Sequence, residues 1–278
     1  MVIREDTHFL IDYVNPRELE LSLRVIDSED PKSSENIINE LDSIWDYHGQ
    51  SHFSNTTRRL QDLGLIIKTK GRDNLWILTT LGIKVKKVLD TNPNLYPDLM
   101  HFLHYSGSPE VRKYFLSYKW CSELLWSRKK LLNTQEMVSF VQSKIEDNFP
   151  NLYQMKIGGN FNAGGVNAWK IWLVDLSPAI FSSDNNQEKQ ILPRMIGDFQ
   201  IALLSLDYLY TSRGYRYGDP ILLNDELIDF MAGIFFLDIN CFSNLLSLSS
   251  KLTRFVNFRE TLAGTTITLQ NSFTYFNL

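Results

Sequence analysis

Residues 53–82 have the sequence FSNTTRRLQDLGLIIKTKGRDNLWILTTLG. Ser54 and Gly64 bracket a short amphipathic helix, because Ser favours the N-cap of a helix and Gly favours the residue after its last turn. The apolar runs 65–69 and 75–78 predict two strands, and the polar residues KGRDN between them predict a hairpin turn. From Thr80 the spacing of apolar residues predicts one more helix.

Two helices are expected before this segment. Asn15 is a good N-cap and Pro16 suits the first helical turn, so the first helix is predicted to begin there. Residues 34–47 place apolar side chains on one face and predict the second helix. The expected order of elements is therefore helix, helix, helix, strand, strand, helix.

The segments NTTRRLQDLGLI and LTTLG, joined by a basic hairpin, resemble the winged-helix DNA-binding superfamily. The resemblance covers residues 15–90 and implies a winged-helix domain over residues 1–92. The layout also resembles, more distantly, uncharacterised winged-helix proteins of bacterial phage-defence gene clusters, such as the DUF4007 family. These resemblances imply contact with DNA and no catalytic residues.

Positive charge gathers in the same part of the chain. The whole chain has a formal net charge of −4, whereas residues 51–90 hold eight basic and three acidic residues. Such a local excess indicates an anionic partner for this segment. The candidate DNA-contacting residues are Asn55, Thr56, Arg58, Arg59, Lys68, Lys70, Arg72 and Lys84.

Helical spacing places Asn55, Arg58, Arg59 and Asp62 on one face of the short helix, which we expect to be exposed. Arg can bond guanine and Asn can bond adenine in a major groove that admits a helix. Lys70 and Arg72 in the turn would meet phosphates. The alternative is an ordinary solvated helix face on which Arg58 and Asp62 form a weak ion pair.

The remainder of the chain predicts a mostly α protein, with a helical domain over residues 93–278. The apolar patterns predict helices over 98–105, 110–126, 134–148 and 225–246, and a C-terminal hairpin around Asn271. The run WLVDLSPAIF repeats the apolar spacing of RLQDLGLIIK and suggests a second, degenerate winged helix. That copy lacks the arginines, so it would serve packing or a partner.

Several motifs fall short of catalytic chemistry. GGNFNAGGVNAW has Gly159 and Gly164 at phosphate-loop spacing, but Gly165 and Val166 stand where the required Lys and Ser or Thr would be. The His pairs 48/52 and 101/104 lack the further ligand of a zinc site. We therefore expect no cofactor, no metal and no catalytic residue, and two reduced cysteines.

Two aromatic segments leave alternatives open. Tyr114, Phe115, Tyr118, Trp120 and Trp126 could stack on a nucleic-acid strand, but their spacing favours a buried helical stripe. Arg213, Tyr215, Arg216 and Tyr217 form a loop that is either a second nucleic-acid contact or a structured turn.

The sequence favours a non-catalytic protein that binds double-stranded DNA, as a regulator or as the DNA-contacting subunit of a bacterial assembly, anti-phage defence included. The alternatives are a protein-interaction subunit of a multisubunit nucleic-acid-processing complex and an accessory subunit of a nucleic-acid enzyme. The apolar run 226–248 suggests a homodimer or a larger protein complex. No apolar signal core or spanning tract is apparent, so we expect a cytoplasmic protein without a membrane contact.

Overall fold

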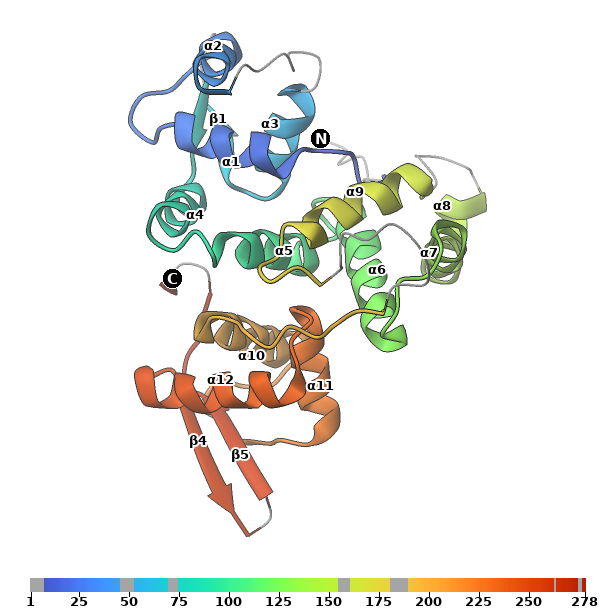
Figure 1. Cartoon of the computed structure of the whole chain (residues 1–278), viewed down its shortest axis with the longest axis vertical. Coiled ribbons are helices and arrows are strands. Elements are labelled where there is room, and N and C mark those ends of the chain that lie inside the picture. Colours follow the sequence, from blue (N-terminus) through green and yellow to red (C-terminus); the bar gives the residue numbers. More distant parts are fainter. Residues whose placement is uncertain are drawn as a thin grey trace.

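The computed structural model describes residues 8–45, 53–69, 75–154, 161–180, 190–262, 264–274 and 277–278. These residues are mostly helical, with a small β-sheet near the C-terminus. The elements form three groups along the long axis of the molecule, and the β4–β5 hairpin projects at one end (Figure 1). One continuous cluster of buried apolar side chains runs through all three groups.

The N-terminal group holds four helices and one hairpin. Its elements are α1 (Pro16–Val25), α2 (Ser34–Trp45), α3 (Phe53–Asp62), β1 (Ile66–Lys68), β2 (Trp76–Leu78) and α4 (Thr80–Thr91). The predicted order of elements is confirmed.

Local capping signals explain where α1 and α4 begin and where α3 ends, whereas α3 begins at Phe53, so Ser54 lies inside the helix and is not its N-cap. The Asn15 side chain accepts a hydrogen bond from the backbone N–H of Arg17 at 2.9 Å, as expected for the cap of α1. Gly64 follows α3 with a φ of 72°, a left-handed conformation that glycine adopts without strain. Thr79 caps α4 by accepting from the N–H of Gly82.

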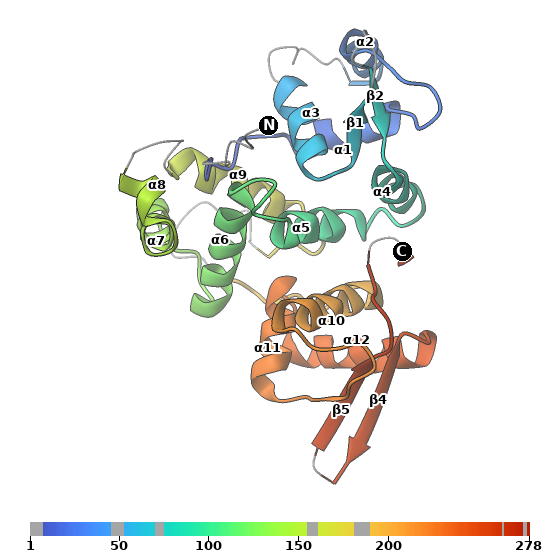
Figure 2. The same ribbon diagram turned by 180° about the vertical axis from the view of Figure 1, so that it is seen from behind.

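Lys32, in the loop between α1 and α2, pairs with the β1–β2 hairpin at the position of a third strand. β1 and β2 pair antiparallel, with Ile66 opposite Leu78. Lys32 forms an isolated antiparallel bridge to Trp76 on the other edge of β2. The N–H of Trp76 donates to the carbonyl of Lys32 at 2.8 Å, and the N–H of Lys32 donates back at 3.1 Å. These two hydrogen bonds tie the loop before α2 to the hairpin, whose strands β1 and β2 are labelled in Figure 2.

Gly82, the glycine of the LTTLG motif, is required because the start of α4 lies very close to the backbone of Leu65. A Cβ built on Gly82 would lie 2.0 Å from the carbonyl oxygen of Leu65. That oxygen is held in place, because it accepts a hydrogen bond from the N–H of Thr79 at 3.0 Å. The start of α4 can therefore pack on the end of α3 only without a side chain at position 82.

We expect Gly82→Ala to lower the free energy of unfolding by about 1–3 kcal/mol, the usual cost of overpacking a filled site. The neighbour Ile83 is 43% exposed, so Ile83→Ala is the matched control and should change stability by less than about 0.5 kcal/mol. Thermal unfolding of both variants by circular dichroism provides the measurement. Equal melting temperatures for the two variants would contradict the steric argument.

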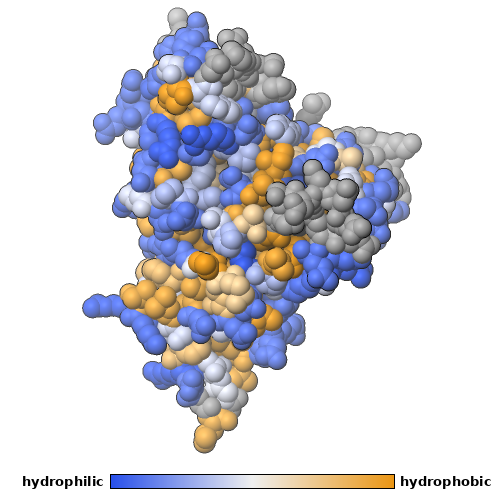
Figure 3. Space-filling model, in the orientation of Figure 1, coloured by the Kyte–Doolittle hydropathy of each residue, from blue (hydrophilic) through white to orange (hydrophobic). Residues whose placement is uncertain are grey.

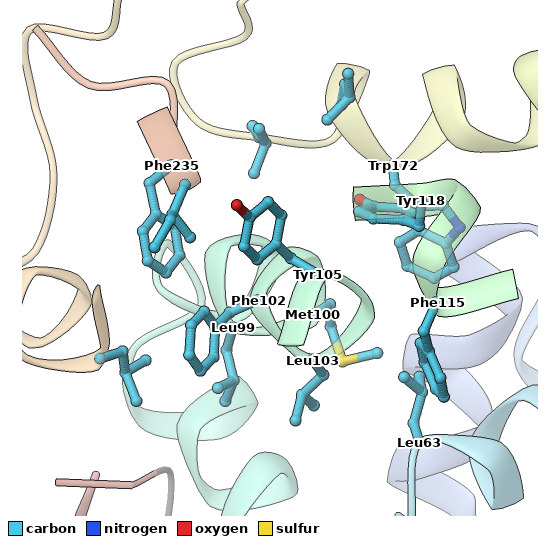
Figure 4. Close-up of a cluster of buried hydrophobic side chains, with 14 of the residues drawn as sticks. Leu63, Leu99, Met100, Phe102, Leu103, Tyr105, Phe115, Tyr118, Trp172 and Phe235 are labelled. Atoms are coloured by element: carbon cyan, nitrogen blue, oxygen red, sulfur yellow. The ribbon is translucent and has the colours of Figure 1, made fainter. Parts of the chain in front are cut away.

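The central group surrounds one buried helix. Its helices are α5 (Tyr96–Ser106), α6 (Tyr114–Arg128), α7 (Thr134–Asn148), α8 (Pro150–Gln154) and α9 (Ala163–Val174). Figure 4 shows α5 side chains directed to opposite sides, with Phe102 toward Phe235 and with Tyr118 and Trp172 across from them. The predicted helices at 98–105, 110–126 and 134–148 are confirmed, and α6 begins four residues later than predicted.

The aromatic stripe of α6 belongs to the core. Tyr114 and Phe115 are 2% exposed and Tyr118 is fully buried. Tyr118 contacts both His101 and His104 of α5, with ring centroids 5.5 and 5.0 Å apart. The interpretation as a buried stripe is therefore confirmed, and these rings are not a surface for stacking bases.

The C-terminal group combines three helices with a three-stranded sheet. Its elements are α10 (Phe199–Arg213), β3 (Ile221–Leu222), α11 (Asp225–Ile234), α12 (Ile239–Leu252), β4 (Val256–Thr261) and β5 (Gly264–Leu269). The strands are antiparallel in the order β3–β5–β4. β4 is thus an edge strand of the projecting hairpin.

Two predictions for this group are wrong. The single helix over 225–246 is broken at 235–238, where Phe236 adopts a φ of 56° and Asp238 caps α12. In the C-terminal hairpin β4 and β5 pair as far as Thr261 opposite Gly264, so the hairpin does not turn around Asn271, which follows β5. In both places the apolar pattern continued through a turn, so periodicity gave no sign of the break.

The break between α11 and α12 is built around Arg194. Its N–H donates to the carbonyl of Phe236 at 2.8 Å, and its own carbonyl accepts from the N–H of Asp238 at 2.9 Å. Its guanidinium donates to both carboxylate oxygens of Asp98 at 2.5 and 2.9 Å, and also to the carbonyls of Phe235 and Ser177. The Arg194 and Asp98 side chains are 1% and 3% exposed, so this ion pair lies inside the core.

The second, degenerate winged helix does not form in the described residues. After α9 the described residues 175–180 and 190–198 hold turns and isolated bridges, with no strand pair. Among the described residues, no helix has the length and apolar character needed to cross a membrane.

Candidate nucleic-acid interface

Helix α3 presents a narrow exposed edge. Ser54, Arg58 and Gln61 are exposed, and Asn55 and Asp62 flank them half-buried. The buried side of the helix contains Phe53, Thr56, Thr57, Arg59 and Leu60. The exposed edge carries groups that donate and accept hydrogen bonds.

Arg58 is the exposed cation of this edge, with a side chain 48% exposed. Its guanidinium donates to a carboxylate oxygen of Asp12 at 2.8 Å and to the side-chain oxygen of Asn55 at 3.0 Å. Asp12 lies in the extended segment before α1. The predicted pair with Asp62 is therefore replaced by one with a residue 46 positions earlier.

The prediction that Arg59 lies on the exposed face is wrong. Arg59 is 2% exposed, and its guanidinium carbon lies 3.9 Å from the centre of the Tyr114 ring. One of its nitrogens donates to the backbone carbonyl of Asp12 at 3.1 Å. The start of α6 and the segment before α1 cover this side of α3, so Arg59 cannot reach DNA in this conformation.

Thr56 is also removed from the interface. It is 1% exposed, and its hydroxyl donates to the carboxylate of Glu18 on α1. Asp62 accepts from Arg112, which precedes α6, at 2.8 Å. The four helical positions that spacing places on one face are thus divided between solvent and two neighbouring segments, the one before α1 and residues 112–114.

The remaining predicted residues lie apart from this edge. Lys68 is exposed at the end of β1, with its ammonium 4.8 Å from the Trp76 ring. Lys84 is half-buried on α4, next to the exposed Lys87. Lys70 and Arg72 lie outside the described residues, as do His48, His52 and Gly159.

The pKa values of the two carboxylates near Arg58 are shifted in opposite directions. A hydrogen bond with His8, together with the nearby Arg58 charge, lowers the pKa of Asp12, so this carboxylate stays ionised opposite Arg58. Burial raises the pKa of Asp62, although the adjacent Arg112 opposes that rise.

The two candidate histidines are structural. His101 shares hydrogen bonds with the Tyr118 hydroxyl at 2.8 Å and the Ile234 carbonyl at 2.7 Å. His104 bonds the Met100 carbonyl within its own helix at 2.8 Å. Within the described residues, no group of three His, Cys, Asp or Glu side chains is arranged to hold a metal ion.

The loop after α10 is an ordered turn. The ring of Tyr217 stacks on Tyr210 at 5.8 Å with an interplanar angle of 3°, and its hydroxyl donates to Asp207 at 3.0 Å. Arg213 lies 5.5 Å over the Phe230 ring. These contacts account for the aromatic residues of the loop as turn-stabilising groups.

Apolar side chains gather on the surface away from α3. Leu192, Met195 and Ile196 are 71%, 66% and 70% exposed in the segment before α10, and Leu252 at the end of α12 is 58% exposed. Figure 3 shows apolar surface over this part of the molecule and at the hairpin tip.

Comparison of the chain with protein-family models, curated proteins and solved structures found no match.

Proposed function

We propose that the chain binds double-stranded DNA without catalysis, as a regulator or as the DNA-contacting subunit of a larger assembly. The supporting observation is the arrangement of α3 before the β1–β2 hairpin, with Lys32 as a third strand position beside β2. This order and pairing supports a winged-helix arrangement, in which the third helix would enter the major groove.

The exposed edge of α3 has the chemistry that such contact needs. Arg58 and Gln61 can reach base edges or phosphates, and Ser54 can bond a phosphate oxygen. Lys68 and Lys87 are exposed at the two ends of the hairpin–α4 segment and add charge for phosphates. Asp12 lies against Arg58, so a phosphate or guanine would replace its carboxylate in the complex.

We expect Arg58→Ala to weaken binding to a random-sequence duplex about tenfold, because one charge-assisted contact is lost. The slope of log affinity against log salt should fall by roughly one unit, the value for one phosphate contact. Fluorescence anisotropy of a labelled duplex over a salt series measures both quantities. Arg128→Ala at the exposed end of α6 is the matched control and should leave affinity and slope unchanged.

Wild-type protein that shows no salt-dependent binding to the duplex would contradict the proposed function. If the wild type and Arg58→Ala bind the duplex equally well and with the same dependence of log affinity on log salt, the DNA contact lies on another surface. Arg59→Ala is unsuitable for this test, because Arg59 is buried and its removal would alter packing.

The second candidate function is a protein-interaction subunit, including self-association as a homodimer. The exposed apolar residues Leu192, Met195 and Ile196 favour it, because monomeric proteins rarely expose contiguous apolar surface of this kind. The two functions are compatible, since this surface lies in a different part of the chain from α3.

A further inference from the structure

A polar cavity lies where α3, the segment before α1 and the start of α6 meet. Its volume is about 200 Å³, and it is lined by His8, Asp12, Arg58, Asp62, Arg112 and Tyr114. The segments that form it are visible together in Figures 1 and 2, beside the N-terminal end of the drawn chain. Tyr114 joins the cavity to the apolar core, and the cavity is large enough for several non-hydrogen atoms.

Among the described residues, two buried donors in this region have no hydrogen-bond acceptor within bonding geometry. They are the hydroxyl of Tyr114, which lines the cavity, and the nitrogen Nη1 of Arg59, which does not line it but belongs to the guanidinium that lies on the Tyr114 ring. Both side chains are 2% exposed. Burial raises the pKa of Tyr114, so its hydroxyl keeps its proton and can donate. The missing group is therefore a hydrogen-bond acceptor.

The charges at the cavity point to an acceptor that is negative. Arg58 is paired with Asp12 and Arg112 with Asp62, each at 2.8 Å. Arg59 is the third guanidinium, and the hydrogen bond found for it goes to the uncharged carbonyl of Asp12. Among the described residues, the guanidinium groups of Arg58, Arg112 and the adjacent Arg59 thus exceed the carboxylates of Asp12 and Asp62 by one, and Arg59 is the buried one. A buried charge without a counter-charge is costly, and an anion would remove that cost.

We propose that this cavity binds a small oxyanion of the inorganic phosphate class. Its oxygens accept from the Tyr114 hydroxyl and from Arg59, with the rim arginines Arg58 and Arg112 completing the site. Guanidinium groups suit this ligand, because their paired N–H donors match the spacing of phosphate oxygens. The site goes beyond the proposed DNA contact and does not require it.

Inorganic phosphate is the probe for the test. Thermal unfolding is followed with increasing phosphate at constant ionic strength, with chloride as the balancing anion, and binding is measured by titration calorimetry. We expect phosphate to raise the melting temperature of the wild type, because a ligand that binds only the folded state stabilises it. Chloride at the same ionic strength should not do so.

Tyr114→Phe removes the hydroxyl and keeps the ring under Arg59. We expect it to weaken phosphate binding about tenfold, as for the loss of one hydrogen bond to a charged group. Tyr96→Phe is the matched control: Tyr96 is 4% exposed and its hydroxyl also lacks a hydrogen-bond partner among the described residues, but it does not line this cavity. Its phosphate affinity should equal that of the wild type.

Arg112→Gln provides a second variant at the rim, where the side chain is 38% exposed and can change without disturbing the core. It should also weaken phosphate binding. If phosphate and chloride stabilise the wild type equally, the acceptor is water and the proposal fails. It fails as well if Tyr114→Phe and Tyr96→Phe bind phosphate with equal affinity. Neither result depends on whether the protein binds DNA.

Discussion

Arg194→Met is expected to lower the free energy of unfolding by about 3–5 kcal/mol, the usual cost of removing one partner of a buried ion pair. Methionine preserves much of the side-chain volume, so the loss is mainly electrostatic. The Asp98 carboxylate would remain 3% exposed without its two hydrogen bonds from the guanidinium. The carbonyls of Phe235 and Ser177 would lose a donor as well.

Urea denaturation of the variant measures this change. The exposed pair Arg24–Asp90 is the matched control, because it has the same chemistry at 2.7 Å with side chains 39% and 47% exposed. Arg24→Met should cost less than about 1 kcal/mol. A similar small cost for Arg194→Met would show that the buried pair does not hold the α11–α12 break in place.

A double substitution separates the effect of the buried charges from the effect of the backbone hydrogen bonds of residue 194. Arg194→Met with Asp98→Leu removes both charges, so it should be less destabilising than Arg194→Met alone. The backbone bonds of residue 194 to Phe236 and Asp238 remain in both proteins. A double variant less stable than the single one by the full cost of Asp98→Leu would indicate independent contributions.

Acidification is expected to destabilise the protein through His101. Burial lowers the pKa of His101 to about 4, from 6.5 in the unfolded chain. Between these values the unfolded state binds a proton that the folded state does not. The stabilising contribution is therefore complete above pH 6.5 and is lost as the pH falls toward 4. One proton corresponds to about 1.4 kcal/mol per pH unit, so the total is roughly 3 kcal/mol.

His101→Gln isolates this effect. Glutamine does not titrate, and its amide can still donate to the carbonyl of Ile234, which accepts from the ring of His101 at 2.7 Å. We expect the free energy of unfolding of the variant to fall less steeply between pH 7 and 5 than that of the wild type. Burial also lowers the pKa of His104. A variant with both His101→Gln and His104→Gln should therefore show a still smaller fall in the free energy of unfolding with decreasing pH.

Urea denaturation at pH 7, 6 and 5 provides the comparison. Carboxylates that titrate in this range are common to all three proteins, so the difference in slope reports the histidines alone. Parallel stability curves for the wild type and His101→Gln would contradict a neutral, buried His101.

The sequence predicted those features that depend on neighbouring residues. Asn15 and Gly64 act within one turn of their helices, so the start of α1 and the end of α3 were located well. The hairpin was predicted because its apolar runs and polar turn are adjacent. Helical spacing also identified the α6 stripe as core.

The errors concern contacts between distant segments. Arg59 is buried by Tyr114, which lies 55 positions later, and no pattern near Arg59 signals that stacking. Asp98 and Arg194 are separated by 96 positions, and their pairing sets the break that periodicity missed. The cavity beside α3 was missed for the same reason, because its lining comes from three segments.

The position of α5 has a consequence for synthesis on the ribosome. Asp98 obtains its partner 96 residues later, and His101 bonds a carbonyl 133 residues later. Near the N-terminus, Phe9 packs on Phe149 with ring centroids 5.3 Å apart. In a nascent chain, Asp98 and His101 of α5 therefore lack their hydrogen-bond partners until translation has passed Ile234. Chaperones that shield apolar helices would meet α5 during that interval.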